Sequence, residues 1–330
     1  MGIQITILGL GQIGASIGMV LADNNDQIHR VGHDKSQEAV RLAKEKNAVD
    51  KVAITLSGAV KDADIVILAL PFQEIYPVLE HISRDLKEDA LVLDTGPLKQ
   101  PVIKWAEELL PANRHFVGVT PVLNFSYLEE FEFGPKTAQK DLFNDCLMAV
   151  VSGHQTNSKA VNMAVNLVQL LGASPYFTDP AEIDGLMTMT HIMPQLLAAS
   201  LLKSTQDSPG WREGRKVAGK PFTQVSSPFS QDDIAGALAA AVIYNQENTS
   251  RVLNDLIRTL VEIRDLSETA DQGKLEDLFT NLQKERDLWW ADRRESNWIE
   301  FPKRDIPRSN FLGQLFGFGR RKPPRKDKDR

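Results

Sequence analysis

The sequence is poor in the residues that build metal centres and disulfide frameworks. Its 330 residues include a single cysteine, Cys146, which excludes an intrachain disulfide and a multi-cysteine metal cluster. The six histidines are scattered and do not show the spacing of metal ligands. We therefore expect no metal at the functional site.

Long hydrophobic runs are also missing. No apolar stretch approaches the roughly 20 residues that span a bilayer, and the N-terminus lacks the charged region and cleavage site of a signal peptide. Hydrophobic residues make up 42% and charged residues 25% of the chain, as in ordinary globular proteins, so a disordered chain or a coiled-coil rod does not fit. We expect a folded cytoplasmic protein with no membrane insertion.

Positive charge is scarce outside one short tail. The formal net charge is −6, but residues 320–330 carry seven basic and two acidic side chains, which leaves −11 for residues 1–319. An acidic body lacks the basic face that nucleic-acid binding requires, so no nucleic acid is expected as a partner. The tail has little apolar surface and is expected to be disordered, although it alone could still touch RNA or anionic lipid.

Short apolar strands alternate with helical patterns through the first half of the chain. This alternation is typical of an α/β protein with a doubly wound parallel sheet of the Rossmann type, covered by helices on both faces. The expected helices lie near 36, 74–86, 98–110 and 157–171. The expected strands are 3–8, 28–34, 63–70, 91–94, 115–119, 147–152 and 175–178.

The second half reads as helical almost to its end. Apolar residues at helical spacing predict helices over 181–204, 232–268 and 274–294, with a long polar connection over 205–231. We predict a dinucleotide-binding domain over 1–179, an all-α substrate and dimerisation domain over 180–299, and a basic tail over 300–330. A small all-α half with a long apolar stripe needs a packing partner, which favours a homodimer.

A glycine motif, GLGQIG at residues 9–14, follows the first strand and opens a helix. Its first glycine permits a tight turn, its second lets the backbone approach a pyrophosphate, and its third allows close packing of helix on strand. The helix start directs free N–H groups at the anion. In this context the motif predicts a dinucleotide site.

An acidic residue, Asp34, lies at the end of the second strand, where a carboxylate can accept hydrogen bonds from the adenosine ribose. The acid repels a 2′-phosphate, which favours NAD, although Arg30 and Lys35 nearby leave NADP open. The residues expected at the cofactor are Gly9, Gly11, Gln12, Ile13, Gly14, Asp34, Leu70, Pro71 and Gly96.

Two further turns, at Leu70–Pro71 and over 94–99 (DTGPLK), follow strands and are expected to flank the nicotinamide, because open α/β sheets bind ligands at the carboxyl ends of their strands. Lys99 either binds a substrate carboxylate or is solvated at the start of a helix.

A polar stripe marks the first helix of the second half. Its members are spaced four, three and four residues apart, which predicts one shared helix face. The stripe either points into a cleft between the domains, with His191 as proton acceptor or hydrogen-bond donor, or is satisfied internally or by solvent. Asn245 interrupts a later apolar stripe and is expected to reach the cleft or satisfy a buried contact. The stripe consists of Asp184, Thr188, His191 and Gln195.

From about residue 3 to 296, the chain resembles the prephenate/arogenate dehydrogenase family of tyrosine biosynthesis. The resemblance implies a nucleotide-binding domain, a helical dimerisation domain, and oxidative decarboxylation of prephenate or arogenate with NAD or NADP. It is carried by GLGQIGAS (9–16), DTGPLK (94–99), FVG (116–118), THIMPQ (190–195), AGKPF (218–222) and Asn245.

The chain departs from the family pattern at three positions. Pro97 stands where the family usually has a serine, Thr120 where it has a histidine that accepts the substrate proton, and residues 225–227 (VSS) where it has an arginine for the substrate carboxylate. A threonine can only position a water or a hydroxyl, so His191 or a bound water would have to act as base. The expected catalytic residues are His191, Lys99, Thr120 and Gln195.

Three functions remain open at this point. The first is an NAD(P)-dependent dehydrogenase of prephenate or arogenate. The second is a dehydrogenase of another small carboxylate, either with His191 or a bound water as base or, for β-hydroxy acids, with Lys99 or Asn124 assisting proton transfer. The third is a dinucleotide-binding regulatory module that has lost hydride chemistry, because fold alone does not fix function.

Overall fold

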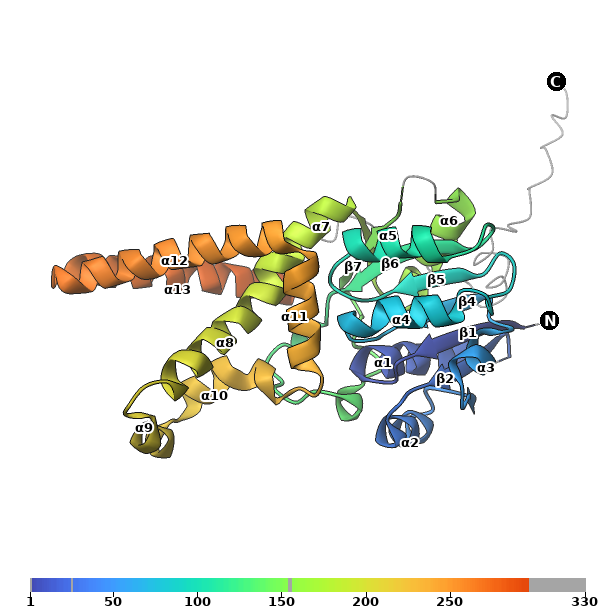
Figure 1. Ribbon diagram of the computed structural model, residues 1–330, viewed down its shortest axis with the longest axis horizontal. Coiled ribbons are helices and arrows are strands. Elements are labelled where there is room, and N and C mark those ends of the chain that lie inside the picture. Colours follow the sequence, from blue (N-terminus) through green and yellow to red (C-terminus); the bar gives the residue numbers. More distant parts are fainter. Residues whose placement is uncertain (1, 25, 154–155, 297–330) are drawn as a thin grey trace, which may run out of the picture.

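The computed structural model describes residues 2–24, 26–153 and 156–296. An eight-stranded sheet forms the N-terminal half, and two helical arms project from one end of it (Figure 1). The predicted basic tail, 300–330, lies outside the described residues.

The sheet has the order β3-β2-β1-β4-β5-β6-β7-β8. Neighbouring strands from β3 to β6 are parallel, as predicted, but β7 pairs antiparallel with β6. The reason lies in residues 122–146, which contain only 3-10 turns, whereas a parallel connection needs a crossover that is usually a helix. The strands are β1 Ile3–Leu8, β2 Ile28–His33, β3 Lys51–Val52, β4 Ile65–Leu68, β5 Leu91–Asp94, β6 His115–Pro121, β7 Leu147–Val151 and β8 Ser174–Phe177.

Helices cover both faces of the sheet, which confirms the doubly wound fold. Residues of α1, α2 and α6 form one apolar core with one face of the strands, and residues of α3, α4 and α5 form a second core on the other face. Because β1 lies between β2 and β4, the turn after β1 sits where the strand order reverses. These helices are α1 Gln12–Leu21, α2 Gln37–Glu45, α3 Leu56–Val60, α4 Phe72–Ile82, α5 Gln100–Leu109 and α6 Ser158–Leu170.

The C-terminal half is helical, as predicted, but two of its expected elements differ. The segment expected as a polar connection contains two short helices and a 3-10 turn. Pro221 stands at the start of the second helix and Pro228 at the start of the 3-10 turn, a position where proline is favoured. The elements up to this point are α7 Pro180–Met187, a π-helical turn η4 Thr188–Ile192, α8 Met193–Gln206, α9 Trp211–Val217, α10 Lys220–Ser226 and η5 Ser227–Ser230.

The expected long helix over 232–268 is broken at Asn245. The residue has non-helical angles (φ −137°, ψ 46°) and separates α11 (Ile234–Tyr244) from α12 (Gln246–Glu268). Its side-chain amide donates to Thr188 Oγ1 at 2.6 Å, so a buried tertiary hydrogen bond accompanies the break. The last helix, α13 (Gln272–Glu295), packs back along α12 (Figure 1).

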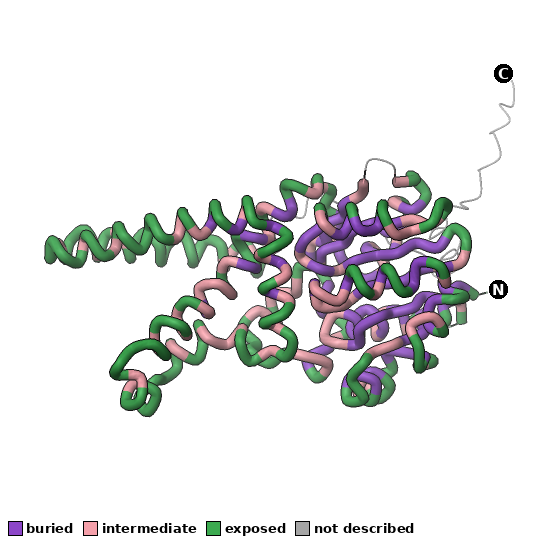
Figure 2. The backbone as a smooth tube through the Cα atoms, in the orientation of Figure 1, coloured by how far each residue is buried: buried purple, intermediate pink, exposed green. Residues whose placement is uncertain are grey.

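Burial differs sharply between the two halves. Figure 2 shows buried backbone along the strands and mostly exposed backbone along α12 and α13. The helical half joins the second core through Ile183, Ile192, Leu238 and Ala241, which contact the α4–α5 side of the sheet. This contact places η4 and α11 beside the carboxyl ends of the central strands.

Candidate active site

The glycine turn after β1 combines two tight positions with one open position. Gly9 has φ +93°, and a Cβ there would lie 2.2 Å from the Ala69 carbonyl oxygen. A Cβ on Gly14 would lie 1.9 Å from the Gly9 carbonyl oxygen. By contrast, no heavy atom lies within 4 Å of the Cβ position of Gly11. Gly9 and Gly14 therefore close the turn, while Gly11 leaves room for a ligand against the backbone.

The first turn of α1 is suited to an anion. Gly11 is its N-cap and supplies no side-chain hydrogen bond, so N–H groups at this helix end remain free for a phosphate. Gln12 and Ile13 begin the helix, and both are half-buried. The residues present thus fit a pyrophosphate.

Asp34, which directly follows β2, holds the glycine turn through hydrogen bonds. One carboxylate oxygen accepts the Leu10 N–H at 2.6 Å, and the other accepts the Ser36 N–H at 2.7 Å. Each oxygen keeps a further lone pair, so the half-buried carboxylate can also receive ribose hydroxyls.

Arg30 is fully buried. From the sequence, it was one of two cations that left binding of NADP possible. Its guanidinium is held by the Asp50 carboxylate and by the carbonyl oxygens of Gly18 and Asn47. Burial tends to raise the pKa of Asp50, but the hydrogen bonds and charge of Arg30 hold it below its usual value. Arg30 is therefore a structural residue and is not available to a 2′-phosphate.

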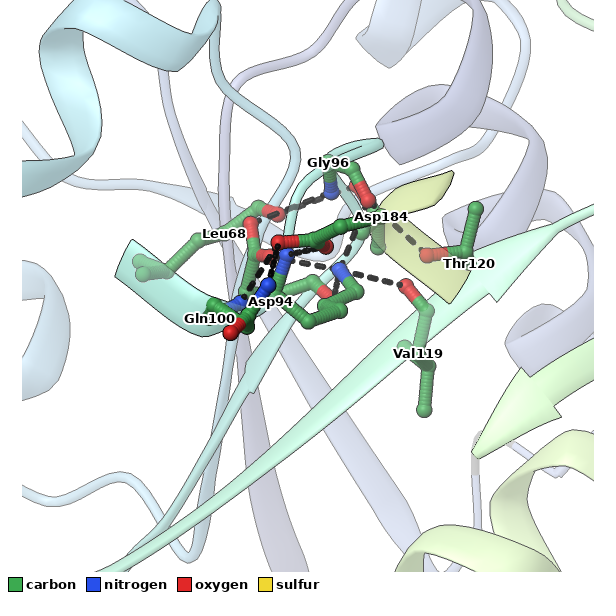
Figure 3. A network of polar contacts seen from close by, with 9 residues as sticks. Leu68, Asp94, Gly96, Gln100, Val119, Thr120 and Asp184 are labelled. Atoms are coloured by element: carbon green, nitrogen blue, oxygen red, sulfur yellow. Dashed lines mark hydrogen bonds and ion pairs between the residues drawn. The ribbon is translucent and has the colours of Figure 1, made fainter. Parts of the chain in front are cut away.

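Lys99 lies in a buried polar network at the turn that follows β5. Figure 3 shows this network around Asp94, Gly96 and Thr120. Its ammonium contacts Asp94 Oδ2 at 2.6 Å, the Gly96 carbonyl oxygen at 2.6 Å and the Val119 carbonyl oxygen at 3.3 Å. Burial lowers the pKa of Lys99, and the charge of Asp94 opposes that shift. Lys99 is thus not solvated, and its ammonium is occupied by protein oxygens.

Thr120 and Gly96 belong to the same network. Thr120 is buried, and its hydroxyl donates to the Gly96 carbonyl oxygen at 2.9 Å. The Gly96 N–H donates to Asp94 Oδ1 at 3.0 Å. Both residues therefore support the turn from below, and neither lines the cleft described below.

Asp184 connects this network to the helical half. It lies on α7, is buried, and accepts the backbone N–H groups of Lys99 at 2.6 Å and Gln100 at 3.1 Å (Figure 3). Burial raises the pKa of Asp184, although these hydrogen bonds act against the shift. The carboxylate of one half thus caps the first turn of α5 in the other.

The π-helical turn divides the predicted polar stripe into two pairs. Asp184 and Thr188 face the buried interior, where Thr188 donates to the Asp184 carbonyl oxygen. His191 and Gln195 instead line an open cleft. A π turn holds more residues than an α turn, so it rotates the residues after it to another face. One pair of the stripe is thus satisfied inside the protein and the other faces the cleft, while the role of His191 as proton acceptor stays a prediction.

The cleft has a volume of about 200 Å³ and lies between the two halves. The nucleotide-binding half contributes Leu70, Pro71 and Pro97 at strand ends, and the helical half contributes residues of η4, α8 and the start of α11. Its charged lining residues are both acidic, Asp232 and Asp233. The sequence signal for this wall was an Asp-Asp pair before an apolar run, which we interpreted only as part of a helix.

His191 is the titratable base of this cleft. The Gln195 amide nitrogen lies 3.1 Å from His191 Nε2, and no hydrogen bond from a described residue reaches Nδ1. His191 is an exposed residue of the cleft, and desolvation by the surrounding protein atoms holds its pKa below the ordinary value of 6.5. A neutral imidazole at neutral pH can accept a proton.

Comparisons with known proteins relate the chain to the prephenate dehydrogenases. Residues 17–176 match the family model described as prephenate dehydrogenase, nucleotide-binding domain, a match that begins after the glycine turn. The chain is 27% identical over 298 residues to a prephenate dehydrogenase of Bacillus subtilis, covering 86% of this chain and 75% of the relative. It is 25% identical over 290 residues to a cyclohexadienyl dehydrogenase of Zymomonas mobilis, covering 86% and 94%.

Solved structures share the fold. An arogenate dehydrogenase of Synechocystis superposes with a TM-score of 0.64 at 22% identity, covering 87% of this chain and all of that chain (100%). A prephenate dehydrogenase of Aquifex aeolicus, solved in complex with hydroxyphenyl propionate and NAD+, gives a TM-score of 0.71 at 18% identity, covering 87% and 99%.

Proposed function

Since the chain is a dehydrogenase whose nucleotide-binding half belongs to the prephenate dehydrogenase family, we propose that it oxidises and decarboxylates arogenate or prephenate with NAD. The observation that carries this proposal is the position of His191. Its imidazole opens into the same cleft as Leu70, Pro71 and Pro97, which stand at the carboxyl ends of the strands. A proton acceptor thus lies beside the edge of the sheet where a Rossmann-type fold holds its nicotinamide.

The cofactor site proposed here runs from the glycine turn to the cleft. Gly11 and the first turn of α1, including Gln12 and Ile13, would hold the pyrophosphate, and Asp34 would hold the adenosine ribose. Leu70 and Pro71 would flank the nicotinamide. Bound NAD supplies the hydride acceptor. Gly9, Gly14 and Gly96 act through the backbone shape rather than by contact.

His191 is proposed as the base. It accepts the proton of the substrate hydroxyl as the carbon-bound hydrogen leaves as hydride, so the hydroxyl becomes a carbonyl. The ring carboxylate then leaves as CO₂, its bonding electrons enter the ring, and the resulting phenolate oxygen takes the proton back from His191. Gln195 orients the imidazole. Lys99 and Thr120 are positioning residues, because their polar atoms hold the turn beside the cleft.

The acidic wall of the cleft favours arogenate over prephenate. Asp232 is exposed and has no described partner, and the cleft lining contains no lysine or arginine. Arogenate and prephenate each carry two carboxylates, but arogenate also carries an ammonium group that such a carboxylate can bind, where prephenate has a neutral keto group. Residues 225–227 supply no arginine for a substrate carboxylate, and Ser226 there donates to the Phe222 carbonyl oxygen on α10.

A homodimer through the helical half is part of the proposal. Large apolar side chains are exposed on α12 and α13, among them Ile257, Leu260, Phe279 and Leu282. The continuous helix Pro180–Gln206 is long and apolar enough to cross a membrane by length and composition alone, and little of it is buried. It carries buried Asp184 and the cleft residue His191, so a second copy of the chain suits it better than lipid. We propose a cytoplasmic location and a domain boundary at residue 179.

The substrate proposal is tested by measuring NADH formation and CO₂ release with NAD and either arogenate or prephenate. We expect a higher kcat/KM for arogenate. Asp232→Asn should lower kcat/KM for arogenate by about tenfold or more, the size of a charged hydrogen bond, without lowering it for prephenate. Asp207→Asn, which removes a carboxylate from an exposed pair with Lys203, is the matched control.

Equal losses on both substrates would contradict the role of Asp232. NAD binding without turnover of either substrate would contradict the proposed reaction. It would favour the two other hypotheses, a dinucleotide-binding regulatory module or a dehydrogenase of another small carboxylate.

A further inference from the structure

An ionic clasp formed by Lys35, Glu74 and Asp233 joins the two halves at the edge of the cleft. The Lys35 ammonium contacts Glu74 Oε1 on the first turn of α4, and it lies 3.0 Å from Asp233 Oδ2 at the start of α11. Lys35 itself belongs to the loop after β2. Three elements far apart in sequence therefore converge on one ammonium group.

The backbone at Asp233 is strained for this contact. Asp233 is the N-cap of α11, with φ +62°, yet its side chain makes no capping hydrogen bond. An aspartate at this position ordinarily stabilises the helix by accepting a backbone N–H. Here its carboxylate is turned to Lys35 instead, and strain of this kind often accompanies a functional contact.

The clasp also lies next to the proposed ribose site. Lys35 directly follows Asp34, whose carboxylate fastens the glycine turn. Arg30 is buried against Asp50. Lys35, which follows Asp34 in the sequence, is exposed, so its ammonium group lies near the proposed ribose site at the protein surface. A 2′-phosphate on that ribose would need such a cation.

We propose that Glu74 and Asp233 set the preference of this chain for NAD over NADP by holding Lys35 away from the 2′-phosphate position. The inference rests on the proposed dinucleotide site. Two carboxylates engage one ammonium and, together with Asp34, surround the place of a 2′-phosphate with negative charge. Both carboxylates raise the pKa of Lys35 through their hydrogen bonds and charge, which favours its ammonium form in the clasp.

Calorimetric titration with NAD and with NADP tests the clasp without relying on turnover. The double variant Glu74→Gln/Asp233→Asn frees Lys35, and the triple variant adds Lys35→Met. The matched control, Glu213→Gln/Asp255→Asn, removes two carboxylates from exposed pairs with Lys216 and Arg258 on α9 and α12. Circular dichroism establishes that each variant is folded.

We expect the ratio of the Kd for NADP to the Kd for NAD to fall at least about tenfold in the double variant and to return to the wild-type ratio in the triple variant. The control should keep the wild-type ratio. An unchanged ratio in a folded double variant that binds NAD would overturn the clasp alone. Wild-type protein that binds neither dinucleotide would overturn the proposed function and the clasp with it.

Discussion

At the scale of single residues, the glycines of the first turn have separable roles. Gly11 has φ −70°, which suits any residue, and the space at its Cβ position is empty. Gly14 has no such space, because its Cβ would meet the Gly9 carbonyl oxygen. A side chain at Gly11 should therefore block binding of the ligand, whereas a side chain at Gly14 should destabilise the folded protein.

We predict that Gly11→Val keeps the free energy of unfolding near that of the wild type but weakens NAD binding at least about 100-fold. Gly14→Ala should lower the free energy of unfolding by about 1–3 kcal/mol, since helix and turn must move apart. Urea unfolding and calorimetry separate the two effects. A folded Gly11→Val protein with wild-type NAD affinity would remove this turn from the cofactor site.

Sequence reasoning reached some of these residues better than others. The glycine turn and Asp34 were predictable because strand, turn, helix and acid follow one another within the chain. The environment of Lys99 was not predictable, because its oxygen partners come from β5, from the turn after it and from β6. Whether a lysine is buried among carbonyl oxygens or exposed to a substrate depends on the tertiary structure, and the local sequence pattern does not predict it.

At the scale of elements, the contact of α7 with the start of α5 holds the halves together. Asp184 is the only carboxylate described here that caps a helix of the other half, and it does so from a buried position. Asp184→Ala should leave the buried N–H of Lys99 and the partly buried N–H of Gln100 without an acceptor and lower the free energy of unfolding by about 1–3 kcal/mol. Urea denaturation measures this loss.

The matched control for that loss is Asp179→Ala. Asp179 caps α7 itself by accepting the N–H groups of Ala181 and Glu182, from an exposed position. Its removal should cost about 1 kcal/mol and leave the Lys99 network intact. Equal costs for both variants would show that Asp184 acts as an ordinary cap and not as a link between halves.

Element boundaries show where periodicity misleads. The helices over 181–204 and 232–268 were predicted from apolar spacing, which assumes an unbroken α-helix. The π turn over Thr188–Ile192 and the break at Asn245 violate that assumption. Both irregularities meet in the hydrogen bond from Asn245 to Thr188, so a tertiary contact between distant helices accompanies them.

At the scale of the whole molecule, helices α12 and α13 project from the sheet as an arm (Figure 1). Exposed apolar side chains on this arm, including Ile257 and Leu260, are the basis of the proposed dimer. We predict that Ile257→Asp/Leu260→Asp shifts the protein from dimer to monomer, because burying each such side chain is worth roughly 1.5–3 kcal/mol. Analytical ultracentrifugation over a concentration series measures the shift.

Glu262→Lys on the same helix changes an exposed charge and not an apolar contact, so it should remain dimeric. A wild-type protein that sediments as a monomer at all concentrations would refute the dimer, and an unaffected Asp variant would place the interface elsewhere.

The central claim is that neutral His191 accepts the substrate proton in place of the missing loop histidine. The most direct measurement is the pH profile of kcat/KM for NADH formation, in wild-type protein and in His191→Asn, with NAD binding verified for both. Because the pKa of His191 lies below its ordinary value of 6.5, activity should fall on the acidic side, as the pH drops through that lowered pKa and the imidazole becomes protonated. His191→Asn should lose about 10²- to 10⁴-fold in kcat/KM and lose the acidic limb of the profile. A variant that binds NAD and keeps both the rate and the acidic limb of the wild type would contradict the account.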